Sequence, residues 1–148
     1  MSEPDRCVIF LRAGRRLRRP EVKKFAERLR REVAAGRAFH CLLTDDRELR
    51  RLNRQFFGKS HATDVLAFPA LAGEGRLGEI AVSVERARDQ AARFGHRLEE
   101  EVGILMLHGL LHLQGLDHEA GRGRMRREES RRRKQLGLPA GMIERVRS

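Results

Sequence analysis

Residues 102–118 read VGILMLHGLLHLQGLDH. From residue 102 to residue 113, everything except two histidines and two glycines is a large apolar side chain. A helix that is hydrophobic on all sides is buried inside a protein. The run therefore predicts a central helix, from about Leu98 to Gln114, that the other elements of the chain must cover.

Three histidines in this stretch have the spacing of metal ligands. His108 and His112 are four residues apart, so their rings project from one face of a helix and can bind one ion. Gly115 can adopt the left-handed conformation that ends a helix, and such a turn would bring His118 round as a third ligand. Three protein ligands leave the fourth position of a tetrahedral zinc ion for water, which is typical of a catalytic site. We therefore predict one Zn2+ per chain, bound by His108, His112 and His118.

The third histidine decides this interpretation, because a lone H-x-x-x-H pair on an apolar helix is usually a coincidence. The complete spacing is that of the metzincin proteases, H-E-x-x-H-x-x-G-x-x-H. The glutamate that serves those proteases as general base is replaced here by Gly109. A metallopeptidase therefore remains only as an alternative, which an assay of peptide cleavage would test.

Outside this stretch the chain alternates strand-like and helix-like segments. Strands are expected at about 7–11, 38–43, 64–68 and 77–84, and helices at about 20–35, 45–56, 85–94, 98–114 and 124–136. The third and fourth strands flank a glycine-containing loop and are expected to pair antiparallel. The pattern predicts a single domain over residues 1–148. Its fold class is α+β (mixed α/β), with a small four-stranded sheet covered by about five helices and the three-histidine site after the buried helix.

The charge of the chain indicates a polyanionic partner. Its 148 residues include 32 Lys and Arg against 21 Asp and Glu, which gives a formal net charge of +11. Arginine binds phosphate through two parallel hydrogen bonds, so nucleic acid is the most plausible partner. The alternative explanation of the positive charge is that the genome favours arginine codons, so that an ordinary protein surface is rich in arginine.

The two cysteines and the N-terminal region indicate a reducing compartment. Cys7 and Cys41 lie in or beside apolar strand-like runs, where buried free thiols are expected rather than a disulfide. The N-terminal residues are polar, and no run approaches the ~18 apolar residues of a membrane span. We expect a cytoplasmic protein with no membrane partner.

Several short motifs resemble one known family. They are Leu52-Asn53, Gly58-Lys59, TDVLAFP at 63–69, GEIAVS at 78–83 and GLDH at 115–118. Together they are similar to the YbeY family of bacterial endoribonucleases. The resemblance implies a zinc-dependent, single-strand-specific endoribonuclease that acts in 16S rRNA 3′-end maturation and ribosome quality control.

The resemblance also implies the partners and the metal ligands. The expected partners are single-stranded RNA, the 16S rRNA precursor and the ribosome or its proteins, bound by a monomer. The zinc ligands carried over by motif are again His108, His112 and His118. A non-catalytic ribosome-assembly factor with a structural zinc remains a second alternative.

Three positions depart from the family pattern. Phe57 stands where the family carries an arginine that is thought to serve RNA cleavage, Glu79 replaces an aspartate, and Ala67 replaces a serine. Arg54, one helical turn before Phe57, is a candidate to take over the phosphate contact.

The remaining candidate residues each have an ordinary structural alternative. For proton transfer they are Asp117, which also suits a turn, and Glu79, which also suits the surface. For RNA binding they are Lys59 and four residues of a C-terminal arginine-rich stripe, Arg126, Arg127, Arg131 and Arg132. Part of that stripe is expected to be a solvated helix face, with Glu128 and Glu129 in i,i+4 ion pairs.

Overall fold

The sheet that covers the central helix has four strands, as expected. The computed structural model describes residues 7–116 and 121–140. The strands are β1 (Val8–Phe10), β2 (Ala38–Thr44), β3 (Val65–Pro69) and β4 (Arg76–Ser83). Their order in the sheet is β1-β2-β4-β3, with β1, β2 and β4 parallel and β3 antiparallel to β4. The antiparallel pairing of the third and fourth strands is confirmed, and β3 is an edge strand.

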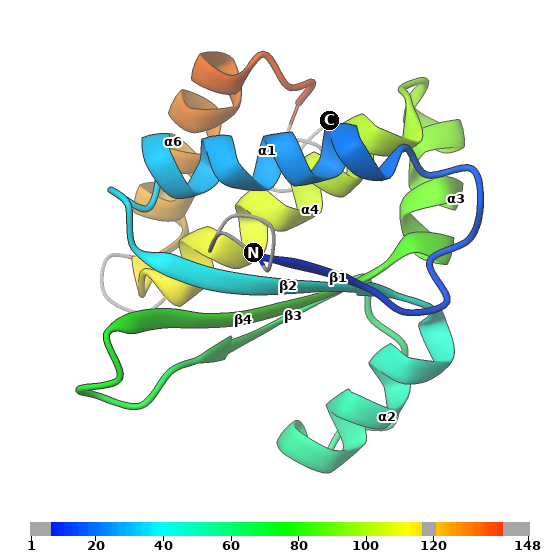
Figure 1. Cartoon of the computed structure of the whole chain (residues 1–148), viewed down its shortest axis with the longest axis horizontal. Coiled ribbons are helices and arrows are strands. Elements are labelled where there is room, and N and C mark those ends of the chain that lie inside the picture. The colour runs from blue at the N-terminus through cyan, green and yellow to red at the C-terminus, as the bar shows by residue number, and fades with distance from the viewer. Residues whose placement is uncertain (1–6, 117–120, 141–148) are drawn as a thin grey trace.

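Five helices accompany the sheet in the described residues. They are α1 (Arg19–Glu32), α2 (Asp46–Phe57), α3 (Val84–Phe94), α4 (Leu98–Leu113) and α6 (Gly121–Leu136). Figure 1 shows α1, α3, α4 and α6 gathered on one side of the sheet and α2 on the other. No helix in residues 7–116 and 121–140 is long and apolar enough to cross a membrane. The α+β class and the four-stranded sheet accompanied by five helices agree with the sequence.

Helix α4 is the centre of the core, as its apolar run predicted. Eleven of its sixteen residues are buried, and they occupy every side of the helix. At Gly109 the helix lies directly against the sheet. A Cβ atom at that position would lie 2.8 Å from Cγ2 of Ile80 and 3.3 Å from Cγ2 of Val65. The absence of a side chain at Gly109 is therefore what lets α4 lie directly on β3 and β4.

Both cysteines are buried free thiols, as the sequence indicated. The side chains of β2 alternate, and the Cys41 side points toward the helices. The Cys7 thiol donates a hydrogen bond of 3.1 Å to the carbonyl oxygen of Phe39. Complete burial raises the pKa of the Cys41 thiol far above its ordinary value, and the neighbouring Cys7 adds to the effect. A thiol in this state is a poor nucleophile, so Cys41 is not a candidate for catalysis.

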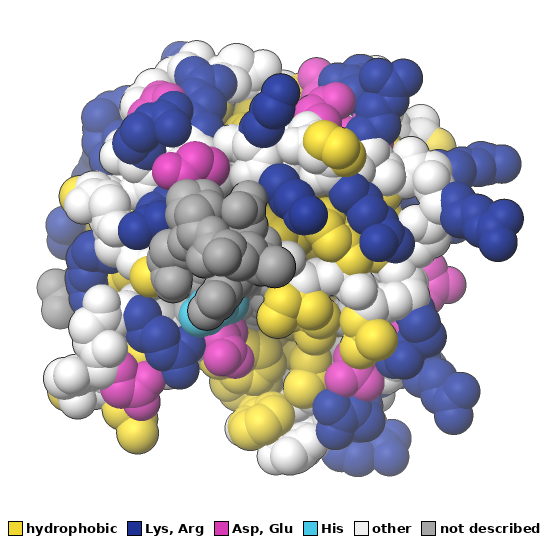
Figure 2. All heavy atoms as spheres, in the orientation of Figure 1, with side chains coloured by type: hydrophobic (Ala, Val, Ile, Leu, Met, Phe, Trp, Pro, Cys, Tyr) yellow, Lys and Arg dark blue, Asp and Glu magenta, His cyan; other side chains and the backbone are white. Residues whose placement is uncertain are grey.

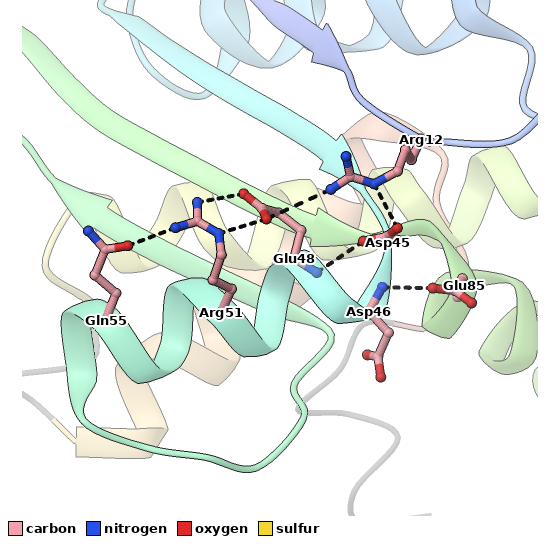
Figure 3. A network of polar contacts seen from close by, with 7 residues as sticks. All are labelled: Arg12, Asp45, Asp46, Glu48, Arg51, Gln55 and Glu85. Atoms are coloured by element: carbon pink, nitrogen blue, oxygen red, sulfur yellow. Dashed lines mark hydrogen bonds and ion pairs between the residues drawn. The ribbon is translucent and has the colours of Figure 1, made fainter.

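An ion-pair network holds the first turn of α2 (Figure 3). The Asp45 carboxylate accepts a hydrogen bond from the Glu48 backbone N–H at 3.0 Å and another from Arg12 at 2.9 Å. Partial burial acts to raise the pKa of Asp45, but these two contacts outweigh it and hold the pKa below its ordinary value. The hydrogen bonds from Arg51 likewise lower the pKa of Glu48. Both carboxylates therefore stabilise the fold above their ordinary pKa range, and this contribution is lost as the pH falls through the lowered values.

The start of α2 is also tied to α3. The Asp46 backbone N–H donates to the Glu85 carboxylate at 2.8 Å, and Arg86 donates to the Asp46 side chain at 2.7 Å. These bonds join the element below the sheet to a helix of the core. At its C-terminal end, α2 contacts the edge strand β3 through Phe56 and Phe57, whose rings pack on Phe68.

Candidate functional site

The two histidines of α4 face each other, as their spacing predicts. Their Nε2 atoms are 2.9 Å apart, and their ring centroids are 4.6 Å apart at an interplanar angle of 67°. The His108 side chain is 14% exposed, and the residues around it on α4 are buried. The pair therefore presents two nitrogen donors at one point, against the core of the protein.

A glutamate from α6 completes the surroundings of His108. The Glu129 side chain is 1% exposed, and its carboxylate lies 2.8 Å from Nδ1 of His108. On α6, Glu129 shares a buried face with Met125 and Leu136. The expectation that Glu129 belongs to a solvated face was wrong, because this face packs on α4. The neighbouring Glu128 does what was expected of both residues, and pairs with Arg131 and Arg132 at i+3 and i+4.

The spacing of α6 carried a signal for this contact that sequence reasoning missed. Met125, Glu129 and Leu136 fall at i, i+4 and i+11, which puts them on one side of a helix. A carboxylate in the middle of such an apolar row is a candidate partner for a buried cation or a buried ring nitrogen. This row of Met125, Glu129 and Leu136 was overlooked because arginines occupy many of the positions around it.

The donors of the pair fit a zinc ion. Two nitrogens bound to one tetrahedral zinc at ~2.0–2.1 Å lie about 3.3 Å apart, which is close to the observed 2.9 Å. A metal-bound histidine also characteristically gives its second ring nitrogen to a carboxylate, as His108 does here. His118 and Asp117 lie outside the described residues, and residues 7–116 and 121–140 contain no set of three metal-binding side chains.

The turn after the helix has the predicted conformation. Gly115 has a φ of +78°, and its backbone N–H donates to the His112 carbonyl at 2.9 Å. The chain thus leaves α4 in the left-handed conformation that the proposed third ligand requires.

The other two candidates for catalysis lie away from the histidine pair. Glu79 is 57% exposed and pairs with Arg76. It stands opposite Phe68 in the β3–β4 ladder, whereas the next residue, Ile80, contacts α4. Arg54 is exposed on α2, which Figure 1 shows on the other side of the sheet. The structure does not bring these residues together with His108, and their catalytic role remains a prediction.

A groove of about 850 Å³ lies between α2 and the open face of the sheet. Its lining includes Ile9, His40, Leu42, Arg51, Phe56, Phe57, Phe68 and Glu79. Figure 2 shows hydrophobic side chains gathered on this part of the surface, below the sheet and beside the C-terminal end of α2. Phe57, the residue in place of the family arginine, stacks on Phe68 of β3 with ring centroids 5.4 Å apart. The groove as a whole was not predicted from the sequence.

The basic stripe of α6 forms a second surface feature. Arg126, Arg127, Ser130, Arg131 and Lys134 line a shallow hollow of about 630 Å³. Arg132, also expected to bind RNA, is 19% exposed and donates to Glu128 and to the carbonyl of Glu32. The basic residues of the hollow are thus more available to a ligand than Arg132 is. Lys59 is exposed just after α2, and Figure 1 shows that α2 and α6 lie on opposite sides of the sheet.

Comparison with known proteins gives one consistent result. The family described as Endoribonuclease YbeY matches residues 15–137. The chain is 57% identical to Endoribonuclease YbeY of Solibacter usitatus over the full length of both proteins. It is 46% identical to Endoribonuclease YbeY of Koribacter versatilis over 82% of this chain and 80% of that one. The solution structure of TM1509 from Thermotoga maritima superposes with a TM-score of 0.59 at 28% identity, and covers 84% of this chain and 85% of that one.

Proposed function

This chain belongs to the endoribonuclease YbeY family, and we propose on that basis that it cleaves single-stranded RNA with a zinc ion held by His108, His112 and His118. The observation that carries the proposal is the pair of Nε2 atoms that face each other across 2.9 Å. In the cell we propose the 16S rRNA precursor as substrate, cleaved during 3′-end maturation and ribosome quality control by a cytoplasmic monomer.

Different residues of the chain would bind the metal ion and the RNA. When bound, zinc supplies an activated water and polarises a phosphoryl oxygen. His108 and His112 hold their rings at one point because α4 is buried on every side. The exposed arginines of α6 attract the phosphates that flank the cleaved bond.

Two other functions are less well supported. A metallopeptidase needs a general base beside the zinc-bound water, and Gly109 occupies that position directly against Ile80. A ribosome-assembly factor with a structural zinc would not need a coordination position open to water. Assays of RNA cleavage and of peptide cleavage distinguish the endoribonuclease, the metallopeptidase and the assembly factor.

The deciding experiment measures zinc content and cleavage in one preparation. The proposal expects one equivalent of zinc, cleavage of a single-stranded RNA, and no cleavage of the same RNA annealed to its complement or of a peptide substrate. Zinc without RNA cleavage would favour the assembly factor, and peptide cleavage would favour the peptidase.

The basic hollow of α6 predicts a strong dependence of RNA binding on salt. Each phosphate neutralised on a single strand contributes about −0.7 to the slope of log K against log salt concentration. Replacing Arg126, Arg127 and Arg131 by Gln should flatten that slope by about 2 and weaken binding at low salt. Titrations of a fluorescent oligonucleotide at several salt concentrations measure it.

A matched control for this prediction removes the same charge elsewhere. Arg15, Arg16 and Arg37 are exposed and lie outside the hollow. Their replacement by Gln should change the slope much less than the α6 variant does. Equal effects of the two triple variants would assign the binding to net charge rather than to the hollow.

Phe57 predicts a weaker phosphate contact than the family arginine would give. Phe57 stacks on Phe68 of β3, and Val65 of the same strand contacts the position of Gly109, next to His108. Three residues of a strand span about 10 Å, so an RNA that crosses this edge would meet both α2 and the histidine pair. Phe57→Arg should therefore speed cleavage, by roughly tenfold to a hundredfold if the new contact is made mainly in the transition state.

Arg54 offers the complementary test. If Arg54 already supplies the phosphate contact, Arg54→Ala should slow cleavage. Arg47 is an exposed arginine two turns earlier on α2, and Arg47→Ala should leave the cleavage rate unchanged. A cleavage time course of the three variants beside the parent protein measures both effects. Unchanged rates in all of them would mean that another part of the protein holds the phosphate.

A further inference from the structure

We infer that Glu129 is a positioning residue, which keeps the His108 ring in the tautomer and orientation that present Nε2 to a metal ion. The inference rests on the proposed function for one point only, that His108 is a metal ligand. It adds a residue from α6 to a site that sequence motifs place on α4 and the turn after it.

The hydrogen bond between Glu129 and His108 determines the ring's tautomer. The carboxylate lies 2.8 Å from Nδ1, within the usual length of a charge-assisted hydrogen bond. A carboxylate oxygen accepts in such a contact, so the donor is an N–H group at Nδ1 of the ring. Nε2 then carries a free lone pair, and Nε2 is the atom that faces His112.

The same bond determines the direction of the ring. The two ring nitrogens point in different directions, so a contact that holds Nδ1 toward α6 also aims Nε2 at the meeting point with His112. A side chain that is 14% exposed could otherwise turn about its χ2 bond. Glu129 supplies this restraint from a helix that is distant from His108 in the sequence.

The burial of Glu129 argues that the residue does more than fill space. It is 1% exposed, and on its own face of α6 the neighbours Met125 and Leu136 are apolar. Taking a carboxylate out of water costs free energy, and a leucine at this position would avoid the cost. The neighbouring Glu128 forms its ion pairs at the partly exposed side of the same helix. The carboxylate on the buried side bonds to His108 at 2.8 Å, which an apolar side chain could not do.

The first test measures metal affinity. Glu129→Gln keeps the size of the side chain and removes its charge, and Glu128→Gln makes the same change one residue earlier. Competition with a chromophoric zinc chelator should show about tenfold to hundredfold weaker binding for Glu129→Gln, the effect typical of losing such a partner. Glu128→Gln should bind zinc within about twofold of the parent protein. Equal affinities in all three proteins would overturn the inference.

The second test needs neither metal nor RNA. In the zinc-free protein with 15N-labelled histidine, long-range 1H–15N correlations report which nitrogen of His108 carries the proton. The inference expects the Nδ1–H tautomer in the parent protein and a loss of that preference in Glu129→Gln. A predominant Nε2–H tautomer in the parent protein would overturn it, whatever the variants do.

These readouts separate the inference from the proposed function. If His108→Ala retains zinc, the metal site fails, yet the tautomer still shows whether Glu129 orients the ring. If Glu129→Gln unfolds, Glu129→Asp keeps the charge, and the inference expects it to retain the Nδ1–H tautomer. Thermal unfolding of the zinc-free proteins provides the control, because a purely structural glutamate would lower the melting temperature without moving the proton on His108.

Discussion

Replacing His112 by alanine will remove most of the bound zinc and abolish cleavage of single-stranded RNA. The two ring nitrogens of the pair meet at 2.9 Å, so loss of one leaves no second donor on α4 to share the ion with His108. The loss of affinity should exceed the ten- to hundredfold that follows the loss of a ligand's hydrogen-bonding partner. Elemental analysis after gel filtration and a cleavage time course measure both effects.

His61 provides the control for this prediction. It is an exposed histidine in the loop after α2, so His61→Ala makes the same chemical change away from α4. We expect it to keep a full equivalent of zinc. If His112→Ala also kept a full equivalent, the assignment of the metal to this pair would be wrong.

Gly109→Glu will destabilise the protein rather than create a peptidase. The substitution restores the glutamate of the protease pattern, but its Cβ atom would lie 2.8 Å from Cγ2 of Ile80, a residue that is itself buried. Overpacking costs about 1–3 kcal/mol, and a carboxylate buried against Ile80 and Val65 without a partner adds to this. We expect the free energy of unfolding to fall by more than about 3 kcal/mol in urea denaturation.

Gly123 provides the matched position. It also lies in a helix, but there a new Cβ atom would meet only the end of the flexible Arg127 side chain, at 3.3 Å. Gly123→Ala should be neutral, or stabilising by up to about 1 kcal/mol through helix propensity. Gly109→Ala should destabilise, because the contact with Ile80 outweighs that gain. A Gly109→Ala protein as stable as Gly123→Ala would show that α4 can move away from the sheet.

Local patterns predicted most of the fold. The apolar run of α4 predicted a buried helix, and Gly115 was predicted to adopt the left-handed conformation that it has after this helix. The alternation of strands and helices predicted four strands and about five helices. These features depend on neighbours in the sequence, which is why the sequence alone was sufficient.

Long-range packing was the part that the sequence did not predict. Glu129 stands among arginines, and its partner His108 is 21 residues away. Only the docking of α6 on α4 brings the two together. The stacking of Phe57 on Phe68 likewise depends on how α2 folds back against β3. In both cases the residue type was visible in the sequence, but its environment follows from packing between elements.

The position of Glu129 on the last described helix has a consequence for the timing of synthesis. A chain made from its N-terminus exposes α4 before α6 exists, with 21 residues between His108 and its carboxylate partner. At about 5–20 residues per second, that interval is roughly one to four seconds, before any further delay while α6 leaves the ribosome. During this interval the His108 ring lacks the contact that orients it. If Glu129 positions His108 as we infer, the histidine pair gains this restraint only after α6 has been made and has packed on α4.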